Sequence, residues 1–198
     1  MQQRREPSDS FDYFPTPLWA TRALCEWLGY NLHVSNDETV LEPACGEGHM
    51  VRALKDYFLS VSAYDIQPMG YGKQADYLFP SYQDDVLNYD WVITNPPFKL
   101  AEQFIEKALR NVNRGACFLT RTSFLEGVGR HNRLFSKTPP SYVLQFSERV
   151  PMLKGRVDKK ASTATSYAWL VWVKPLSITT FDWIPPCRKR LEKEGDYA

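Results

Sequence analysis

The chain has 198 residues, 43% of them hydrophobic, and a formal net charge of +1 at pH 7. This length and apolar content suffice to bury the core of one domain, and we expect a single domain over 1–198. The balanced charge excludes a basic field over the whole surface, so composition alone does not indicate a nucleic-acid-binding protein.

Hydrophobic periodicity predicts helices that alternate with short apolar strands. The first helix is expected over 16–29, where Pro17 suits the first turn, and further helices over 49–58, 99–112 and 123–135. Strands are expected over 39–42, 60–65, 75–78, 91–94, 115–120, 141–146 and 166–174. This alternation is typical of an α/β fold: a doubly wound, Rossmann-like sheet of seven mostly parallel strands with helices on both faces.

The last two expected strands are connected differently from the others. No helical pattern separates 141–146 from 166–174, which favours a terminal antiparallel hairpin. We place the core of the domain over about 11–175 and a basic tail over 185–198.

The cysteines and histidines do not form a metal-binding pattern. They are Cys25, Cys45, Cys117, Cys187, His33, His49 and His131. Their wide spacing, without a Cys-x-x-Cys pair, indicates no zinc site and is typical of a reducing cytoplasm, where we expect the protein. No apolar stretch reaches the length of a membrane span, and no apolar signal segment follows residues 1–6, so we expect no membrane partner.

The most informative segment is Asn95-Pro96-Pro97-Phe98, directly after the apolar run 91–94. Two prolines cannot continue a sheet ladder, so the strand has to stop with the Asn95 amide and the Pro96 carbonyl at its carboxyl end. These are two neighbouring hydrogen-bond acceptors beside an aromatic ring, an arrangement that suits an amino group on a planar ring. The alternative interpretation is a strand that ends in a simple proline turn.

A second candidate site lies at 42–48, Glu-Pro-Ala-Cys-Gly-Glu-Gly, between an expected strand and an expected helix. Its two glycines allow a tight turn and the close approach of a ligand to the backbone. The segment lacks the third glycine of a dinucleotide fingerprint and the Gly-Lys-Ser/Thr of a phosphate loop. At the end of the next strand, Asp65 is placed to bind ribose hydroxyls and Ile66 to cover a purine.

In this order the motifs resemble those of the class I S-adenosylmethionine-dependent methyltransferases, specifically the adenine-N6 DNA methyltransferases in their compact, phage-like form. The likeness covers about 11–175 and is carried by 14–17 (Phe-Pro-Thr-Pro), 42–48, Asp65, 76–78 and 95–98. It implies S-adenosyl-L-methionine as the cofactor and nucleic acid, in particular duplex DNA, as the partner.

The resemblance also implies roles for individual residues. The implied cofactor-binding residues are Phe14, Thr16, Glu42, Ala44, Cys45, Gly46, Gly48, Asp65, Ile66 and Asp76. Asp84 and Asp85 compete with Asp76 for the adenine amino group of the cofactor. The implied catalytic residues are Asn95, Pro96, Pro97 and Phe98.

The chemistry of the Asn95 motif can be argued from its groups. An aromatic amine is a poor nucleophile, because its lone pair is delocalised into the ring. If the Asn95 side-chain oxygen and the Pro96 carbonyl each accept one N–H, the nitrogen becomes more tetrahedral and its lone pair points at the methyl group. Phe98 would then stack on a base that has been extracted from the duplex.

Cations over 147–165 form a candidate phosphate-binding loop. They are Arg149, Lys154, Arg156, Lys159 and Lys160. Phosphate contacts supply position and affinity rather than sequence specificity, and the alternative is an ordinary solvated loop. Arg130 and Arg133 are a second candidate, whereas we expect His131 to be a surface residue.

Three other functions remain open: methylation of RNA adenine, methylation of protein glutamine, and nucleic-acid binding without catalysis. Phe98 argues against the second, because the glutamine enzymes favour tyrosine there. Cytosine-C5 methylation is rejected, since its cysteine nucleophile follows a proline at the end of the catalytic strand. The Pro-Cys pair of this chain is Pro186-Cys187, beyond the last expected strand.

Overall fold

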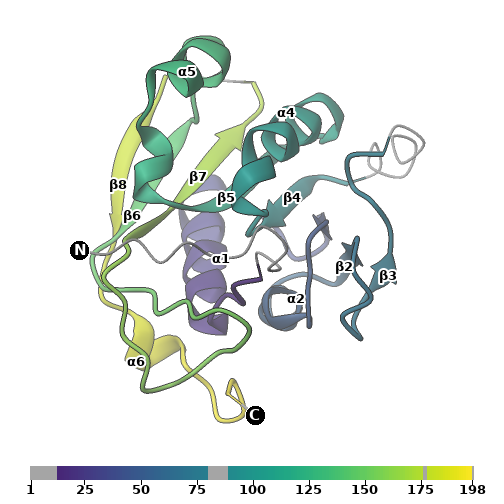
Figure 1. Cartoon of the computed structure of the whole chain (residues 1–198), viewed down its shortest axis with the longest axis vertical. Coiled ribbons are helices and arrows are strands. Elements are labelled where there is room, and N and C mark those ends of the chain that lie inside the picture. Colours follow the sequence, from purple (N-terminus) through teal and green to yellow (C-terminus); the bar gives the residue numbers. More distant parts are fainter. Residues whose placement is uncertain (1–12, 80–88, 176–177, 198) are drawn as a thin grey trace.

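The computed structural model describes residues 13–79, 89–175 and 178–197, and one β-sheet runs through its centre (Figure 1). Within these residues the sheet has eight strands in the order β3-β2-β1-β4-β5-β7-β6-β8. They are β1 Thr39–Glu42, β2 Ser60–Asp65, β3 Lys73–Gln74, β4 Trp91–Thr94, β5 Gly115–Arg121, β6 Tyr142–Phe146, β7 Tyr167–Val173 and β8 Thr180–Ile184. The strands from β3 to β5 pair in parallel, and β7 is antiparallel to β5 and β6. The predicted mostly parallel sheet with a terminal antiparallel hairpin is confirmed.

Helices cover both faces of this sheet (Figure 1). They are α1 Leu18–Leu32, α2 His49–Leu54, α4 Ala101–Asn111, α5 Val128–Arg130 and α6 Arg188–Leu191, with short 3₁₀ helices η2 Phe98–Leu100 and η3 Thr122–Leu125 and a short π-helix η4 His131–Phe135. Residues of α1, α2 and α6 share one buried cluster with one face, and α4 and η4 share a second cluster with the other. None of the helices described is long and apolar enough to cross a lipid bilayer.

The central strands are buried on both sides, which explains why they read as continuous apolar runs. All four residues of β4 are buried, and Trp91 packs in the α1 cluster while Val92 packs in the α4 cluster. Since side chains alternate along a strand, one short segment supplies both cores. The end of β4, where Asn95 follows, is therefore held by packing from both layers.

The sheet has one strand more than the sequence predicted. β8 pairs in parallel with β6 and extends the edge of the sheet beyond the hairpin. Its pattern alternates, with Phe181 and Trp183 exposed on one face and Ile184 buried on the other. This alternation indicates a half-buried edge strand, and it lies in a segment to which we assigned no element.

Three element boundaries also differ from prediction. The expected strand 75–78 is a turn in which Asp76 accepts a hydrogen bond from the Leu78 N–H, and the strand itself is the shorter β3 upstream. The expected helix 49–58 ends at Leu54, followed by hydrogen-bonded turns. The expected helix 123–135 is broken at Gly127, whose φ of 109° only glycine adopts readily.

The segment over 185–197 packs against α1 through ion pairs. Arg22 of α1 is buried and donates two hydrogen bonds to Asp196, at 2.7 and 2.9 Å, and a third to Asp56 at 2.7 Å. Arg188 pairs with Glu192, and Arg190 pairs with Glu26 of α1. The cations predicted as a basic tail are thus largely neutralised by neighbouring carboxylates.

Candidate active site

The carboxyl ends of β1, β2 and β4 meet the segment 13–16 around a cavity of about 260 Å³. The predicted residues that line it are Phe14, Thr16, Glu42, Ala44, Cys45, Asp65, Ile66, Asn95, Pro96, Pro97 and Phe98. Ligands of open α/β sheets bind at this edge, outside the carboxyl ends of the strands. The structure therefore brings together residues that lie up to 84 positions apart, from Phe14 to Phe98.

The Asn95 side chain is held in one orientation. Its Nδ2 donates to the main-chain oxygen of Phe14 at 2.8 Å and approaches the Met152 sulfur at 3.8 Å. The amide has to face this way, because a carbonyl oxygen can accept only from the nitrogen end. Its Oδ1 is buried and has no hydrogen-bond partner among the described residues. A buried acceptor without a donor is costly, so this oxygen is a position where a ligand donor would be favoured.

Phe98 stands at the start of η2 and belongs to a group of rings beside Asn95. Its ring centroid lies 5.3 Å from that of Phe14, and the Arg121 guanidinium carbon lies 4.1 Å from the Phe98 centroid. Arg121 is the last residue of β5, the strand beside β4. Sequence analysis missed it, although an arginine at the carboxyl end of a buried strand next to the motif was a readable signal.

Glu42 ends β1 and is buried at the wall of the cavity. Its Oε1 accepts hydrogen bonds from Thr94 Oγ1 at 2.5 Å and from the Ala44 N–H at 3.0 Å. Burial raises the pKa of this carboxyl to about 8, and the two donors only partly oppose that rise. Thr94 therefore fixes Glu42 from the neighbouring strand, which the sequence did not reveal because the two lie 52 residues apart.

The glycine turn and Asp65 form one hydrogen-bonded unit. Gly46 adopts φ 51°, and its N–H donates to Asp65 Oδ2 at 2.8 Å. The other carboxylate oxygen of Asp65 accepts from the Gln67 N–H at 2.9 Å. Gly46 and Gly48 are not among the lining residues themselves, but they shape the turn that brings Ala44 and Cys45 to the cavity.

The remaining predicted cofactor residues differ in their placement. Ile66 lines the cavity and is 53% exposed, so its side chain can cover a flat ligand. Asp76 is exposed, does not line this cavity and caps its own turn. Asp84 and Asp85 lie outside the described residues.

Cys45 lines the cavity as a packing residue. Burial raises the pKa of its thiol to about 12, and Sγ lies 3.6 Å from the carbonyl oxygens of Gly46 and Tyr71. A thiol with so high a pKa is a poor nucleophile at neutral pH. No group of three or more His, Cys, Asp or Glu side chains in the described ranges is arranged to hold a metal ion.

Tyr13 and His49 are cavity residues that sequence analysis did not select. Tyr13 Oη lies 3.3 Å from His49 Nδ1 and accepts from the Glu47 N–H at 3.3 Å. Burial raises the pKa of Tyr13 to about 12 and lowers that of His49. Both side chains are therefore neutral at pH 7, and they close the cavity beside the glycine turn. Tyr13 directly precedes Phe14, and His49 directly follows the glycine segment 42–48. Both therefore lie next to motifs that the sequence analysis had identified.

The predicted basic loop reaches the site through its apolar residues. Val150 and Met152 are buried in the α1 cluster, and Met152 Sδ lies 3.9 Å from Thr16 Oγ1. The Gly155 N–H donates to the Tyr13 carbonyl at 3.0 Å. This part of the loop, which includes Lys154 and Arg156, therefore lies along the segment 13–16 beside the cavity.

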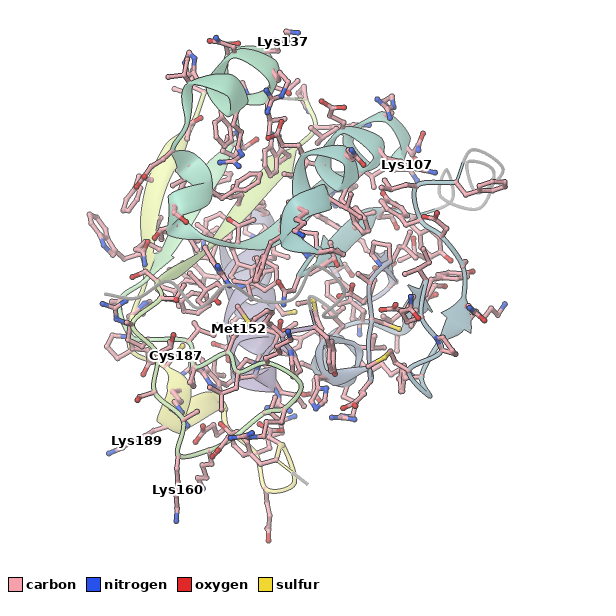
Figure 2. The ribbon with its side chains drawn as sticks, in the orientation of Figure 1. Lys107, Lys137, Met152, Lys160, Cys187 and Lys189 are labelled. Atoms are coloured by element: carbon pink, nitrogen blue, oxygen red, sulfur yellow. The ribbon has the colours of Figure 1, made fainter. Side chains whose placement is uncertain are left out.

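The rest of the loop runs toward α6. The carbonyl of Lys159 accepts a hydrogen bond from Arg188 at 2.6 Å, and Figure 2 shows Lys160 pointing outward far from the centrally placed Met152. Arg149 donates to the Ala164 carbonyl and to Ser166 Oγ. The five predicted cations thus do not form one patch.

The second candidate pair is engaged elsewhere. Arg130 and Arg133 both form ion pairs with Glu102 of α4, at 3.3 and 3.0 Å. Arg130 also donates to the carbonyls of Phe124 and Glu126. These ion pairs link α5, through Arg130, and η4, through Arg133, to α4.

The fold resembles those of solved methyltransferases at low sequence identity. A methyltransferase subunit of a type I restriction-modification system from Streptococcus thermophilus superposes with a TM-score of 0.67 at 12% identity, over 93% of this chain and 49% of that one. A Listeria monocytogenes protein assigned to the class I S-adenosylmethionine-dependent methyltransferases gives 0.58 at 14% identity, over 88% and 67%. A Pyrococcus horikoshii protein assigned as an RNA methyltransferase gives 0.54 at 19% identity, over 85% and 91%.

The chain spans about half the length of the streptococcal subunit. No protein-family model and no curated protein matches the sequence. At these identities the likeness concerns the fold. The protein has the fold of the class I S-adenosylmethionine-dependent methyltransferases, as the order of its motifs implied.

Proposed function

We propose that this protein is an S-adenosylmethionine-dependent methyltransferase that methylates the N6 amino group of adenine in DNA. Two residues that line the cavity carry the proposal: Asn95, whose buried Oδ1 has no hydrogen-bond partner in the described part of the chain, and Pro96, whose carbonyl follows it. An exocyclic amino group supplies two N–H donors, one for each of these oxygens. The same group would be the methyl acceptor.

The cavity residues suit S-adenosylmethionine. Asp65 carries a carboxylate to the end of β2, where two ribose hydroxyls could bind, and Ile66 offers an apolar face to the adenine ring. Thr16, Glu42 and the backbone at Ala44 would surround the methionine part. When bound, S-adenosylmethionine supplies an electrophilic methyl group on a sulfonium.

The chain's own residues would act by orientation. Asn95 Oδ1 and the Pro96 carbonyl draw the amino nitrogen toward a tetrahedral arrangement, so its lone pair is directed at the methyl carbon. Pro97 fixes the backbone that follows and thereby places Phe98. Phe98 would stack on the adenine, a contact worth about 1–3 kcal/mol for each stacked base. The nitrogen can lose its proton after the methyl group arrives, so no strong base has to act first.

DNA as the substrate is supported by two features. The Phe98 ring beside the acceptor pair suits a base removed from the helix. The near part of the basic loop, with Lys154 and Arg156, lies beside the same cavity and could hold phosphates. RNA adenine is the second candidate, favoured by the fold likeness to the Pyrococcus protein. Protein glutamine and binding without catalysis are further outcomes of the test.

The test is transfer of a labelled methyl group to genomic DNA, total RNA and protein, followed by nucleoside analysis. We expect N6-methyladenine in DNA with the parent protein and none with Asn95→Ala. Label in RNA or glutamine alone would replace the proposed substrate. A protein that binds S-adenosylmethionine and labels none of the three would overturn the proposed activity.

A further inference from the structure

Arg121 is a cation at the active-site edge that the proposed chemistry leaves without a task. It is partly buried, and its guanidinium carbon lies 4.1 Å from the Phe98 ring centroid and 5.7 Å from that of Phe14. Guanidinium groups stack favourably on aromatic faces. A guanidinium that stacks on a ring can still donate hydrogen bonds in its own plane.

The hydrogen-bonding capacity of Arg121 is unused in the part of the chain that the structure describes. Its Nε is buried without a partner, and its two terminal nitrogens donate to no described residue. Arg114, which directly precedes β5 at the opposite end of the strand, differs. It also lies over an aromatic ring, 5.9 Å from the Trp91 centroid, but it pairs with Glu38 at 2.8 Å.

The register places Arg121 beside the site of the base. Thr94 pairs with Phe118 across β4 and β5, so Asn95 and Arg121 extend from neighbouring strands at the same sheet edge. A base that reaches Asn95 and Phe98 carries its own backbone phosphates within one nucleotide of that edge. The planar fork of a guanidinium matches two phosphate oxygens, and a charge-assisted pair of this kind is among the stronger hydrogen bonds.

We propose that Arg121 grips a DNA phosphate that flanks the target adenine, through its two terminal nitrogens, while Phe98 holds the base. Arg121 is thereby a positioning residue: its contact with the phosphate holds the extracted nucleotide in place, so that the base reaches Asn95. This inference rests on the proposed function in one respect, that the substrate is DNA. It does not depend on the methyl-transfer step.

The first experiment measures binding without turnover. Protein saturated with S-adenosylhomocysteine is titrated with a short fluorescent duplex of mixed sequence over a range of salt. Arg121→Gln should flatten the plot of log affinity against log salt by roughly 0.9, the share of one phosphate contact. Arg121→Lys should keep the slope, because it keeps the charge, yet bind about tenfold more weakly, because the fork is lost.

Arg114→Gln is the matched control, because Arg114 also lies over an aromatic ring but directly precedes β5, at the end of the strand opposite Arg121. It should leave the slope unchanged. Equal slopes for parent and Arg121→Gln, at equal melting temperatures, would overturn the proposal. A slope change seen with single-stranded RNA and not with duplex DNA would overturn its commitment to DNA.

The second experiment separates a phosphate contact from mere support of the Phe98 ring. Neutral methylphosphonate linkages are placed one at a time around the methylated adenine. At one linkage the methylphosphonate should weaken DNA binding by the parent about tenfold. The same linkage should not weaken binding by Arg121→Gln further, because the guanidinium that contacts this phosphate is already absent. If the loss of affinity from Arg121→Gln and the loss from the methylphosphonate add at every linkage, Arg121 contacts none of these phosphates. It would then only support the Phe98 ring, and the proposed contact would be overturned. A protein that passes the salt test but methylates no DNA would refute the proposed activity and leave the DNA contact standing.

Discussion

Asn95 Nδ2 donates to the main-chain oxygen of Phe14 at 2.8 Å, and this bond decides which atom of the amide meets a ligand. Because the donor nitrogen Nδ2 is turned toward Phe14, the acceptor oxygen Oδ1 is turned away from it. The segment 13–16, before α1, thus determines that Asn95, after β4, offers an acceptor rather than a donor to a ligand.

Asn95→Ala should reduce methyl transfer at least a hundredfold and leave cofactor affinity nearly unchanged. Removal of one preorganised group at a reacting centre commonly costs this much in turnover. Asn31→Ala is a matched control, since Asn31 also donates from Nδ2 to a main-chain oxygen but lies exposed on α1. Single-turnover kinetics and calorimetry would measure both quantities. A loss of only a few-fold in turnover would remove Asn95 from the role proposed for it.

Asp65→Ala should weaken S-adenosylmethionine binding by about tenfold or more, because a carboxylate that hydrogen-bonds to hydroxyls is lost. Asp76→Ala is the informative comparison, since Asp76 is exposed and does not line the cavity. Calorimetry on both variants would locate the carboxylate that binds the cofactor. Unchanged affinity in Asp65→Ala would move the ribose site elsewhere, and weakened affinity in Asp76→Ala would extend the site to the turn after β3.

The stability of the protein should depend on pH through Glu42. Its carboxyl has a pKa of about 8 in the fold against 4.5 as the reference value, so the folded state holds the proton more firmly. The corresponding stabilisation is fully present below pH 4.5 and is lost as pH rises through about 8. Glu42→Gln keeps the shape without the titration. The difference in free energy of unfolding, parent minus Glu42→Gln, should therefore decrease across that window. Urea titrations that give the same difference at every pH would contradict the buried, protonated carboxyl.

The basic loop should divide into two functional halves. Lys154→Ala with Arg156→Ala should flatten the salt dependence of DNA affinity, by roughly 0.9 for each lost phosphate contact. Lys159→Ala with Lys160→Ala should change it less, because these residues lie toward α6. Cofactor affinity should stay constant in both double variants. If the two pairs flatten the slope equally, the DNA path extends to α6, and if neither does, the loop is an ordinary solvated segment.

Arg22→Ala should destabilise the fold by about 3–5 kcal/mol, because it strands Asp196 as a buried charge without its partner. Arg190→Ala removes an exposed pair with Glu26 and should cost less than about 1 kcal/mol. Thermal or urea unfolding would compare them. Equal costs would show that the buried pair is not what attaches the C-terminal segment to α1.

The strand ends that line the cavity could be predicted from the sequence, because strand ends carry local signals. The prolines at 96 and 97, the glycine turn and Asp65 each mark where a strand stops, and parallel topology brings those stops together. The contacts of Thr94 with Glu42, and of Met152 with Asn95, could not be predicted in this way. They join residues 52 and 57 positions apart through packing, which no local pattern records.

The misplaced elements show the same limit. A strand was expected over 75–78, Ala-Asp-Tyr-Leu, but Asp76 caps its own turn, and this local hydrogen bond competes with pairing in the sheet. The cations of the basic loop were grouped because they are neighbours in sequence. In the fold, buried Val150 and Met152 fix one end of the loop and α6 fixes the other, so the group separates.

The Tyr13 ring occupies the space that a side chain at position 46 would need. A Cβ on Gly46 would lie 2.3 Å from Tyr13 Cε2, and the backbone there has φ 51°. The identities of positions 13 and 46 are therefore interdependent. A related sequence with a side chain at 46 should carry a small residue at 13, and that side chain should be Asn or Asp, which tolerate this backbone. Replacement of Tyr13 by a smaller residue would free the space next to Gly46, and only then could position 46 carry a side chain.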